Sequence, residues 1–171
     1  HDALPIWRFL GTAAASTAAF TLVPRYVLGG ATFVAPSDTI NIAIVGCGGQ
    51  GRTNARGLFG HKDVRIIAVA DVNEQDDYSR FYYGGTAGRK PVKAEVEKRY
   101  RQDNPRFRCG EYVDFRKMLD HEKDIDAILC ATPDHWHAFV TIAAMKRGKH
   151  VYCEKPLTHN INEARRVAKV A

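Results

Sequence analysis

Residues 40–51 read Ile40-Asn41-Ile42-Ala43-Ile44-Val45-Gly46-Cys47-Gly48-Gly49-Gln50-Gly51, an apolar run that ends in a Gly-x-Gly-x-x-Gly pattern. A second apolar run, Val64 to Ala70, ends at Asp71, twenty positions after Gly51. Two buried strands joined through a glycine-rich turn, with an acid at the tip of the second, predict a dinucleotide-binding site. The alternative is a glycine-rich turn that binds nothing.

The glycines suit a pyrophosphate for separate reasons. Gly46 permits a tight turn, Gly48 allows the backbone to approach the phosphates, and Gly51 allows the following helix to pack closely on the sheet. Asp71 can accept hydrogen bonds from the ribose hydroxyls, and its charge would repel a 2′-phosphate, so NAD is favoured over NADP. The predicted phosphate-binding loop consists of Gly46, Cys47, Gly48, Gly49, Gln50 and Gly51.

The composition fits one globular domain of 171 residues with 45 % apolar residues and a net charge of +6. The segment from Arg80 to Arg108 contains nine Lys or Arg residues but only three Asp or Glu residues. A solvated basic face is favoured over a nucleic-acid surface, because no nucleic-acid motif accompanies the charge. The four cysteines, at positions 47, 109, 130 and 153, form no C-x-x-C pair, so neither a zinc site nor a redox pair is predicted.

Residues 1–38 are expected to be a leader and linker outside the fold. Phe9 to Val23 is apolar but short for a membrane span, and it resembles the hydrophobic region of a secretory signal. The stretch is similar to a twin-arginine export signal, although the paired arginines would fall at Ile6-Trp7 and only Arg8 is basic. Export to the periplasm and a cytoplasmic protein with a disordered or membrane-associated leader both remain open.

The remaining pattern alternates between strands and helices. Strands are expected at 40–45, 64–70, 107–109, 125–131 and 151–153. Helices are expected at 50–58, 91–101, 114–119, from the segment 132–137 to about 147, and from the capping box of Asn160 and Glu163 onward. In the last helix, an inward-facing stripe is expected from Ile161, Ala164, Val167 and Ala168. Residues 72–90 are expected to be a loop with an apolar knot at 81–83. This order predicts an α/β fold with a doubly wound parallel (Rossmann) sheet, incomplete at its C-terminal edge.

Polar clusters follow four of the expected strands, and parallel strands bring their carboxyl ends to one edge. His135 and His137 lie two residues apart after the fourth strand, without further ligands at metal-binding spacing, so no metal is predicted. His137 is expected to form hydrogen bonds at the helix start near the cofactor. His135 is expected either to reach the ligand or to face solvent, and Trp136 to pack rather than to stack on a sugar.

Three segments together carry a family resemblance. They are residues 42–51, Ala131-Thr132-Pro133-Asp134-His135-Trp136-His137-Ala138, and Gly148-Lys149-His150-Val151-Tyr152-Cys153-Glu154-Lys155-Pro156. In this order they resemble the N-terminal domain of the glucose–fructose oxidoreductase/inositol dehydrogenase (Gfo/Idh/MocA) family over residues 39–171. The resemblance implies NAD(P)-dependent oxidation or reduction of a sugar, cyclitol or related polyol.

The resemblance also implies roles for single residues. Thr132, Pro133 and His137 would line the nicotinamide side, with His135 beside them, and Glu154 would contact the nicotinamide ribose. Lys155 and His137 are the predicted catalytic residues. A partly buried Lys155 beside a cationic nicotinamide would favour its neutral amine, which could orient or deprotonate a hydroxyl; the alternative is a surface lysine in a turn.

In this family a second α/β domain supplies most substrate contacts. The chain is therefore expected to be a fragment that is inactive alone, from a full-length protein that forms a homo-oligomer without a stable membrane span. A non-catalytic NAD-binding module and a nucleic-acid binder that uses residues 80–108 are the competing hypotheses. A methyltransferase would also use a glycine-rich loop, but the family-specific segments exclude it.

Overall fold

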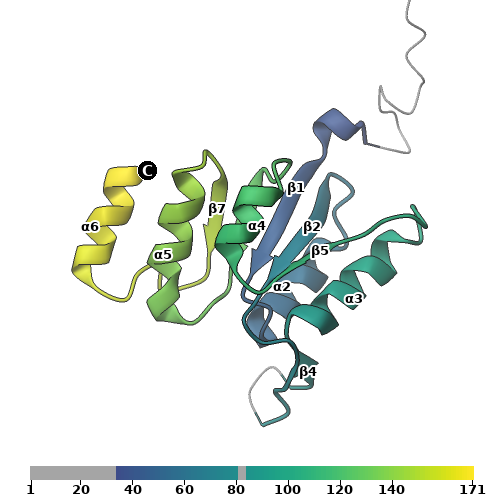
Figure 1. The fold of residues 1–171 in the computed structure, drawn as a ribbon, viewed down its shortest axis with the longest axis horizontal. Coiled ribbons are helices and arrows are strands. Elements are labelled where there is room, and N and C mark those ends of the chain that lie inside the picture. The colour runs from purple at the N-terminus through teal and green to yellow at the C-terminus, as the bar shows by residue number, and fades with distance from the viewer. Residues whose placement is uncertain (1–33, 81–83) are drawn as a thin grey trace, which may run out of the picture. The chain divides into compact units, whose positions relative to one another are not determined.

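Five parallel strands form the central sheet of the computed structural model, which describes residues 34–80 and 84–171 (Figure 1). In spatial order they are β5 (Gly110–Tyr112), β2 (Val64–Ala70), β1 (Ile40–Val45), β6 (Ala127–Cys130) and β7 (His150–Cys153). All four pairings are parallel. The chain moves outward from β1 first to one side and then to the other, so the predicted doubly wound sheet is confirmed.

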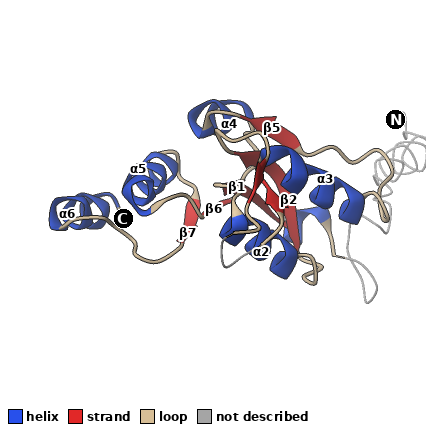
Figure 2. Ribbon diagram, turned by 90° about the horizontal axis from the view of Figure 1, so that it is seen from below, coloured by secondary structure: helices blue, strands red, loops and turns tan. Residues whose placement is uncertain are grey.

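Helices cover both faces of this sheet (Figure 2). On one face, α2 (Gly49–Leu58) and α3 (Arg89–Tyr100) pack on a core that includes Ile44, Ile66 and Leu129. On the other, α4 (Phe115–His121) and α5 (Asp134–Met145) pack on Val45, Ala68 and Ile128. Successive strand residues therefore enter opposite cores, which explains why β1 reads as a continuous apolar run.

The third strand was predicted at residues 107–109, which is wrong. Phe107 packs on α3 instead, with its ring centroid 5.1 Å from that of Tyr100. The backbone N–H of Cys109 donates to Glu97 on α3 (3.1 Å), so the chain pairs with β2 only from Gly110 onward. The Glu97 carboxylate thus accepts the hydrogen bond that the Cys109 N–H would otherwise donate to a neighbouring strand.

The last helix, α6 (Ile161–Val170), begins at the predicted capping box. The Asn160 side chain accepts from the Glu163 backbone N–H (3.0 Å), and Glu163 accepts in return from the His159 N–H (2.8 Å). The predicted inward stripe is wrong: Val167 is buried, whereas Ile161 is 73 % exposed.

Short elements complete the fold. A turn of 3-10 helix, η2 (Pro36–Asp38), precedes β1, and the predicted loop at 72–90 contains the antiparallel hairpin of β3 (Asp76–Asp77) and β4 (Thr86–Ala87). The apolar knot at 81–83 and the signal-like stretch lie outside the described residues. Within the described ranges, no helix is both long and apolar enough to cross a bilayer.

Candidate functional site

The turn between β1 and α2 is pressed against the end of β6. Gly46 has a φ of 91°, and a Cβ there would lie 2.6 Å from the backbone of Ala131 and Thr132. A Cβ on Gly51 would overlap the carbonyl oxygen of Gly46. Gly48 is the N-cap of α2 without a side-chain cap, so the first backbone N–H groups of this helix are available to an anion.

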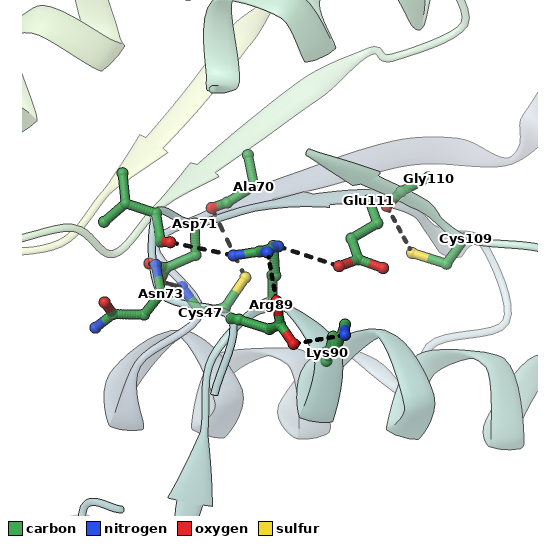
Figure 3. Close-up of polar contacts among 11 residues, drawn as sticks. Cys47, Ala70, Asp71, Asn73, Arg89, Lys90, Cys109, Gly110 and Glu111 are labelled. Carbon is green, nitrogen blue, oxygen red and sulfur yellow. Dashed lines mark hydrogen bonds and ion pairs between the residues drawn. The ribbon is translucent and has the colours of Figure 1, made fainter. Parts of the chain in front are cut away.

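Asp71 touches the glycine-rich loop directly. Its Oδ2 accepts from the backbone N–H of Cys47 at 2.6 Å, and its Oδ1 accepts from that of Asn73 at 2.8 Å (Figure 3). The Cys47 side chain is fully buried, and burial together with the charge of Asp71 raises the pKa of its thiol well above the ordinary value. Cys47 therefore packs beneath the loop, and its backbone groups are already bonded: the N–H donates to Asp71, and the carbonyl oxygen accepts from the Gly88 N–H at 2.8 Å.

Arg89 fixes the segment that follows Asp71 (Figure 3). Its guanidinium donates to the Val72 carbonyl and pairs with Glu74 and Glu111, each at 3.1 Å. The side chain is only 12 % exposed. Four of the other eight basic residues in segment 80–108 are also paired with acids, which favours the solvated-face interpretation of this segment; they are Lys90, Lys93, Arg99 and Arg101.

A cavity of about 360 Å³ opens at the carboxyl ends of the strands. It lies beside β1, where the direction of winding reverses, and ligands of doubly wound sheets bind at such a point. Its size is at the lower end of the range for small-molecule sites. The cavity brings together five residues predicted from sequence: Gly46, Asp71, Thr132, Pro133 and His135.

The sequence interpretation missed part of this cavity wall. Val113 to Arg116 line it, and their position directly after β5 would have indicated this had that strand been placed correctly. Trp136 also lines the cavity and is 46 % exposed, with its ring centroid 6.5 Å from that of Phe115. Trp136 thus packs on its aromatic neighbours, as expected, and also forms part of the cavity wall.

Glu154 connects the end of β7 to the first turns of α2. Its Oε1 accepts from the Asn54 side chain at 2.6 Å and from the Gln50 side chain at 3.1 Å. Two residues predicted to bind the cofactor, Gln50 and Glu154, are thus in contact. Asn54 was missed, although its position four residues after Gln50 places both on one face of the helix.

His137 lies beneath the site rather than in its wall. The residue is 1 % exposed, and its ring nitrogens contact the carbonyl oxygens of Pro156 (2.6 Å) and Thr132 (2.7 Å). It joins the segments after β6 and β7, so we regard it as a positioning residue in place of the predicted catalytic one. Lys155 is exposed, which corrects the expected partial burial, and it does not line the cavity.

Comparison with known proteins indicates the same family as the sequence motifs do. Residues 40–171 match the profile of the GFO_IDH_MocA family, an oxidoreductase family with an NAD-binding Rossmann fold. A glycosyl hydrolase family 109 protein from Solibacter usitatus is 26 % identical over 75 % of this chain and 26 % of its own length. An alpha-N-acetylgalactosaminidase from Shewanella oneidensis is 24 % identical over 81 % of this chain and 27 % of its own.

Solved structures agree with the sequence match. A myo-inositol 2-dehydrogenase from Lactobacillus plantarum superimposes with a TM-score of 0.55 and 27 % identity, over 77 % of this chain and 32 % of that one. A scyllo-inositol dehydrogenase from Lactobacillus casei, crystallised with NAD(H) and scyllo-inositol, gives 0.56 and 25 % over the same shares. The chain thus spans about a quarter to a third of the length of these relatives. From the glycine loop, the strand order and these matches together, the chain belongs to the Gfo/Idh/MocA oxidoreductase family and contains its NAD-binding Rossmann domain.

Proposed function

We propose that the protein carrying this domain is an NAD-dependent oxidoreductase that transfers hydride between nicotinamide and a sugar, cyclitol or related polyol. The observation that carries the proposal is the cavity at the point of reversal, whose wall includes Gly46 and Asp71 as well as Thr132 and Pro133. Names of the similar structures, which are inositol dehydrogenases, support the substrate class.

The residues present suit NAD. Gly48 and Gly49 place no side chains of their own at the start of α2, and the α2 N-terminus favours the charge of a pyrophosphate. Each Asp71 oxygen accepts one hydrogen bond from the backbone and retains lone pairs for ribose hydroxyls. The carboxylate would repel a 2′-phosphate, so we propose NAD rather than NADP as the cofactor.

At the ends of β6 and β7, Thr132, Pro133 and Glu154 would hold the nicotinamide end. When bound, the nicotinamide supplies the hydride acceptor or donor. Lys155 directly follows Glu154 and is exposed, so it can reach and orient the substrate hydroxyl, and as a neutral amine it would take up the hydroxyl proton. His137 would keep both segments in place through its two contacts with backbone carbonyls.

The test measures NADH formation by the full-length protein with NAD and a panel of inositols and sugars. Lys155→Ala should lower turnover by about 100-fold or more while NAD affinity changes little, because positioned proton transfer is worth about 10²–10⁴-fold. Lys169→Ala, an exposed lysine on α6, is the matched control and should leave turnover unchanged. Equal losses of turnover and affinity in Lys155→Ala would make this lysine a cofactor ligand only. NAD binding without turnover of any substrate would favour the non-catalytic module.

A second candidate function is glycoside hydrolysis. It is favoured by the names of the curated relatives, which include family 109 glycosyl hydrolases and an alpha-N-acetylgalactosaminidase. A hydrolase that uses NAD would release nitrophenol from a nitrophenyl glycoside without accumulating NADH. Nitrophenol release that requires NAD, together with no NADH from free sugars, would replace the dehydrogenase proposal.

We also propose, from sequence alone, that Phe9 to Val23 acts as an export signal and that the full-length protein forms a homo-oligomer. N-terminal sequencing of the protein recovered from a periplasmic fraction tests the first proposal, since cleavage after the apolar stretch is expected. Light scattering coupled to gel filtration tests the second. An uncleaved cytoplasmic product, or a monomer, would overturn the respective proposal.

A further inference from the structure

Cys130 and Cys153 lie side by side at the carboxyl ends of β6 and β7. They are direct partners in the parallel register of these strands. Neighbouring strands lie about 4.8 Å apart, which falls within the Cα separation that a disulfide spans. Both side chains belong to the core on the α5 face of the sheet, and their sulfur atoms lie within 4.8 Å of each other. No spacing pattern in the sequence indicates this pair, because the two cysteines are far apart in the chain.

The surroundings of Cys153 favour its thiolate. The Thr141 hydroxyl on α5 is buried and has no hydrogen-bond partner among the described residues. The Cys130 thiol and then the Thr141 hydroxyl stabilise the charged form, and the His137 ring adds to this, which lowers the pKa of Cys153 to about 6 against the effect of burial. The pKa of Cys130 is raised in the same pair.

Access distinguishes the two thiols as well. Cys130 is fully buried, whereas Cys153 is partly accessible. Cys47 and Cys109 are buried, and burial raises the pKa of Cys109 to about 12. Cys153 therefore combines access with thiolate character, the properties that mark a reactive cysteine.

We propose that Cys153 and Cys130 form a peroxide-oxidisable thiol pair, in which Cys153 reacts first and Cys130 resolves it to an intramolecular disulfide. The Cys153 thiolate attacks one peroxide oxygen: an S–O bond forms, the O–O bond breaks, and the leaving hydroxide takes up a proton as water. The Cys130 sulfur then attacks the Cys153 sulfenic acid. An S–S bond forms, the S–O bond breaks, and the Cys130 proton leaves with the hydroxyl as a second water. The two thiols together lose two electrons, and the peroxide is reduced.

A metal ion would compete for the same atoms, since one His137 ring nitrogen lies within 4.8 Å of both sulfurs. Both His137 nitrogens, however, already contact carbonyl oxygens at 2.6 and 2.7 Å. Zinc binding would have to break one of these contacts and would still need a fourth ligand. The geometry therefore favours thiol chemistry over metal binding.

The disulfide would join the strand ends that carry two parts of the candidate site. Thr132 follows Cys130 by two residues, and Glu154 follows Cys153 directly. The Cys130 carbonyl already accepts from the Glu154 backbone N–H at 2.9 Å. Oxidation thus places a covalent bond directly beneath the residues proposed to face the nicotinamide end.

The test treats the reduced, purified chain with hydrogen peroxide and maps its disulfides by mass spectrometry. A loss of about 2 Da, reversed by dithiothreitol, and a Cys130–Cys153 linked peptide are expected. In the untreated protein at neutral pH, iodoacetamide should modify Cys153 at least about tenfold faster than Cys47 or Cys109. This second measurement needs no variant and is independent of NAD binding and catalysis.

Variants then separate the two roles. Cys130→Ser should stop at a Cys153 sulfenic acid that dimedone traps, and Cys153→Ser should form neither product. Cys109→Ala is the matched control and should form the disulfide as the wild type does. The proposal is overturned if Cys153 reacts no faster than Cys47 and Cys109, if the disulfide links two copies of the chain, or if one equivalent of zinc stays bound through dialysis and blocks oxidation.

Discussion

Replacing Gly51 by alanine tests whether α2 packs against the β1 turn as closely as the structure indicates. A Cβ at this position would overlap the Gly46 carbonyl oxygen and lie 2.9 Å from its carbonyl carbon. Carbon atoms in contact are normally about 3.5–4.0 Å apart, so the contact with the carbonyl carbon alone requires a shift of roughly 0.6 Å, and the overlap with the oxygen requires a larger one. Both partners are backbone, so no flexible side chain can absorb the shift.

Gly57, on the same helix, provides the matched control. A Cβ there would meet nothing within 4 Å, so Gly57→Ala should stabilise the fold by about 0.5–1 kcal/mol through helix propensity. The same gain applies at Gly51, so the difference between the two variants isolates the close contact. Overpacking of this kind lowers the free energy of unfolding by about 1–3 kcal/mol.

Urea unfolding followed by far-UV circular dichroism measures both free energies. We expect the midpoint to fall for Gly51→Ala and to rise for Gly57→Ala, with unchanged slopes. NAD affinity of Gly51→Ala should also fall, since the displaced helix N-terminus is the proposed pyrophosphate site. Equal stabilisation by both substitutions would refute the close approach of α2 to the turn.

Three further predictions test single residues. Asp71→Ser should tighten NADP binding relative to NAD by about tenfold, because a like charge near the 2′-phosphate is removed; fluorescence titration with NADPH and NADH measures the ratio, and an unchanged ratio would contradict the role of Asp71. Asn160→Ala should lower stability by about 1 kcal/mol and speed amide exchange in α6, whereas the exposed Asn162→Ala on the same helix should do neither. Hydrogen bonds from Arg116 hold the pKa of Asp114 at about 2, below the unfolded-state pKa of about 3.9. The Asp114 carboxylate therefore stabilises the fold fully above about pH 3.9, and this stabilisation is lost as the pH falls toward 2. Urea midpoints between pH 5 and 2 should therefore fall less for Asp114→Asn than for the wild type, and parallel falls would contradict this.

Local signals were sufficient where one strong feature governs an element. Strands β1 and β2 have the predicted bounds, because apolar runs covered on both faces have few alternatives. The cap of α6 was predicted because Asn160 and Glu163 act at short range: the Asn160 side chain accepts from the Glu163 backbone N–H, and the Glu163 carboxylate accepts from the His159 backbone N–H. The contact of Gly51 with Gly46 followed from the known geometry of the glycine pattern.

Tertiary contacts decided the failures. Phe107 to Cys109 has the residue types of a strand, yet Tyr100 and Glu97 on α3 hold this segment away from β2. The exposure of Ile161 has a similar cause, since an amphipathic pattern specifies a face but not the surface that covers it. Because the third strand was predicted three residues too early, the cavity wall at 113–116 was missed as well. Residues 113–116 would be site candidates only if the strand were predicted to end directly before them.

The alternation of strand side chains between the two sheet faces would have predicted more of the site than the spacing of motifs along the sequence did. Ile128 and Cys130 face the α5 core, whereas Leu129 between them faces α2. Since Cys153 pairs with Cys130, it also faces α5, and the next residue along the chain turns to the opposite face. Glu154 accordingly meets Gln50 and Asn54 on α2. The cysteine pair and the glutamate contact therefore follow from one register, which places a reactive thiol and a proposed cofactor ligand at adjacent positions on opposite faces of the same strand end.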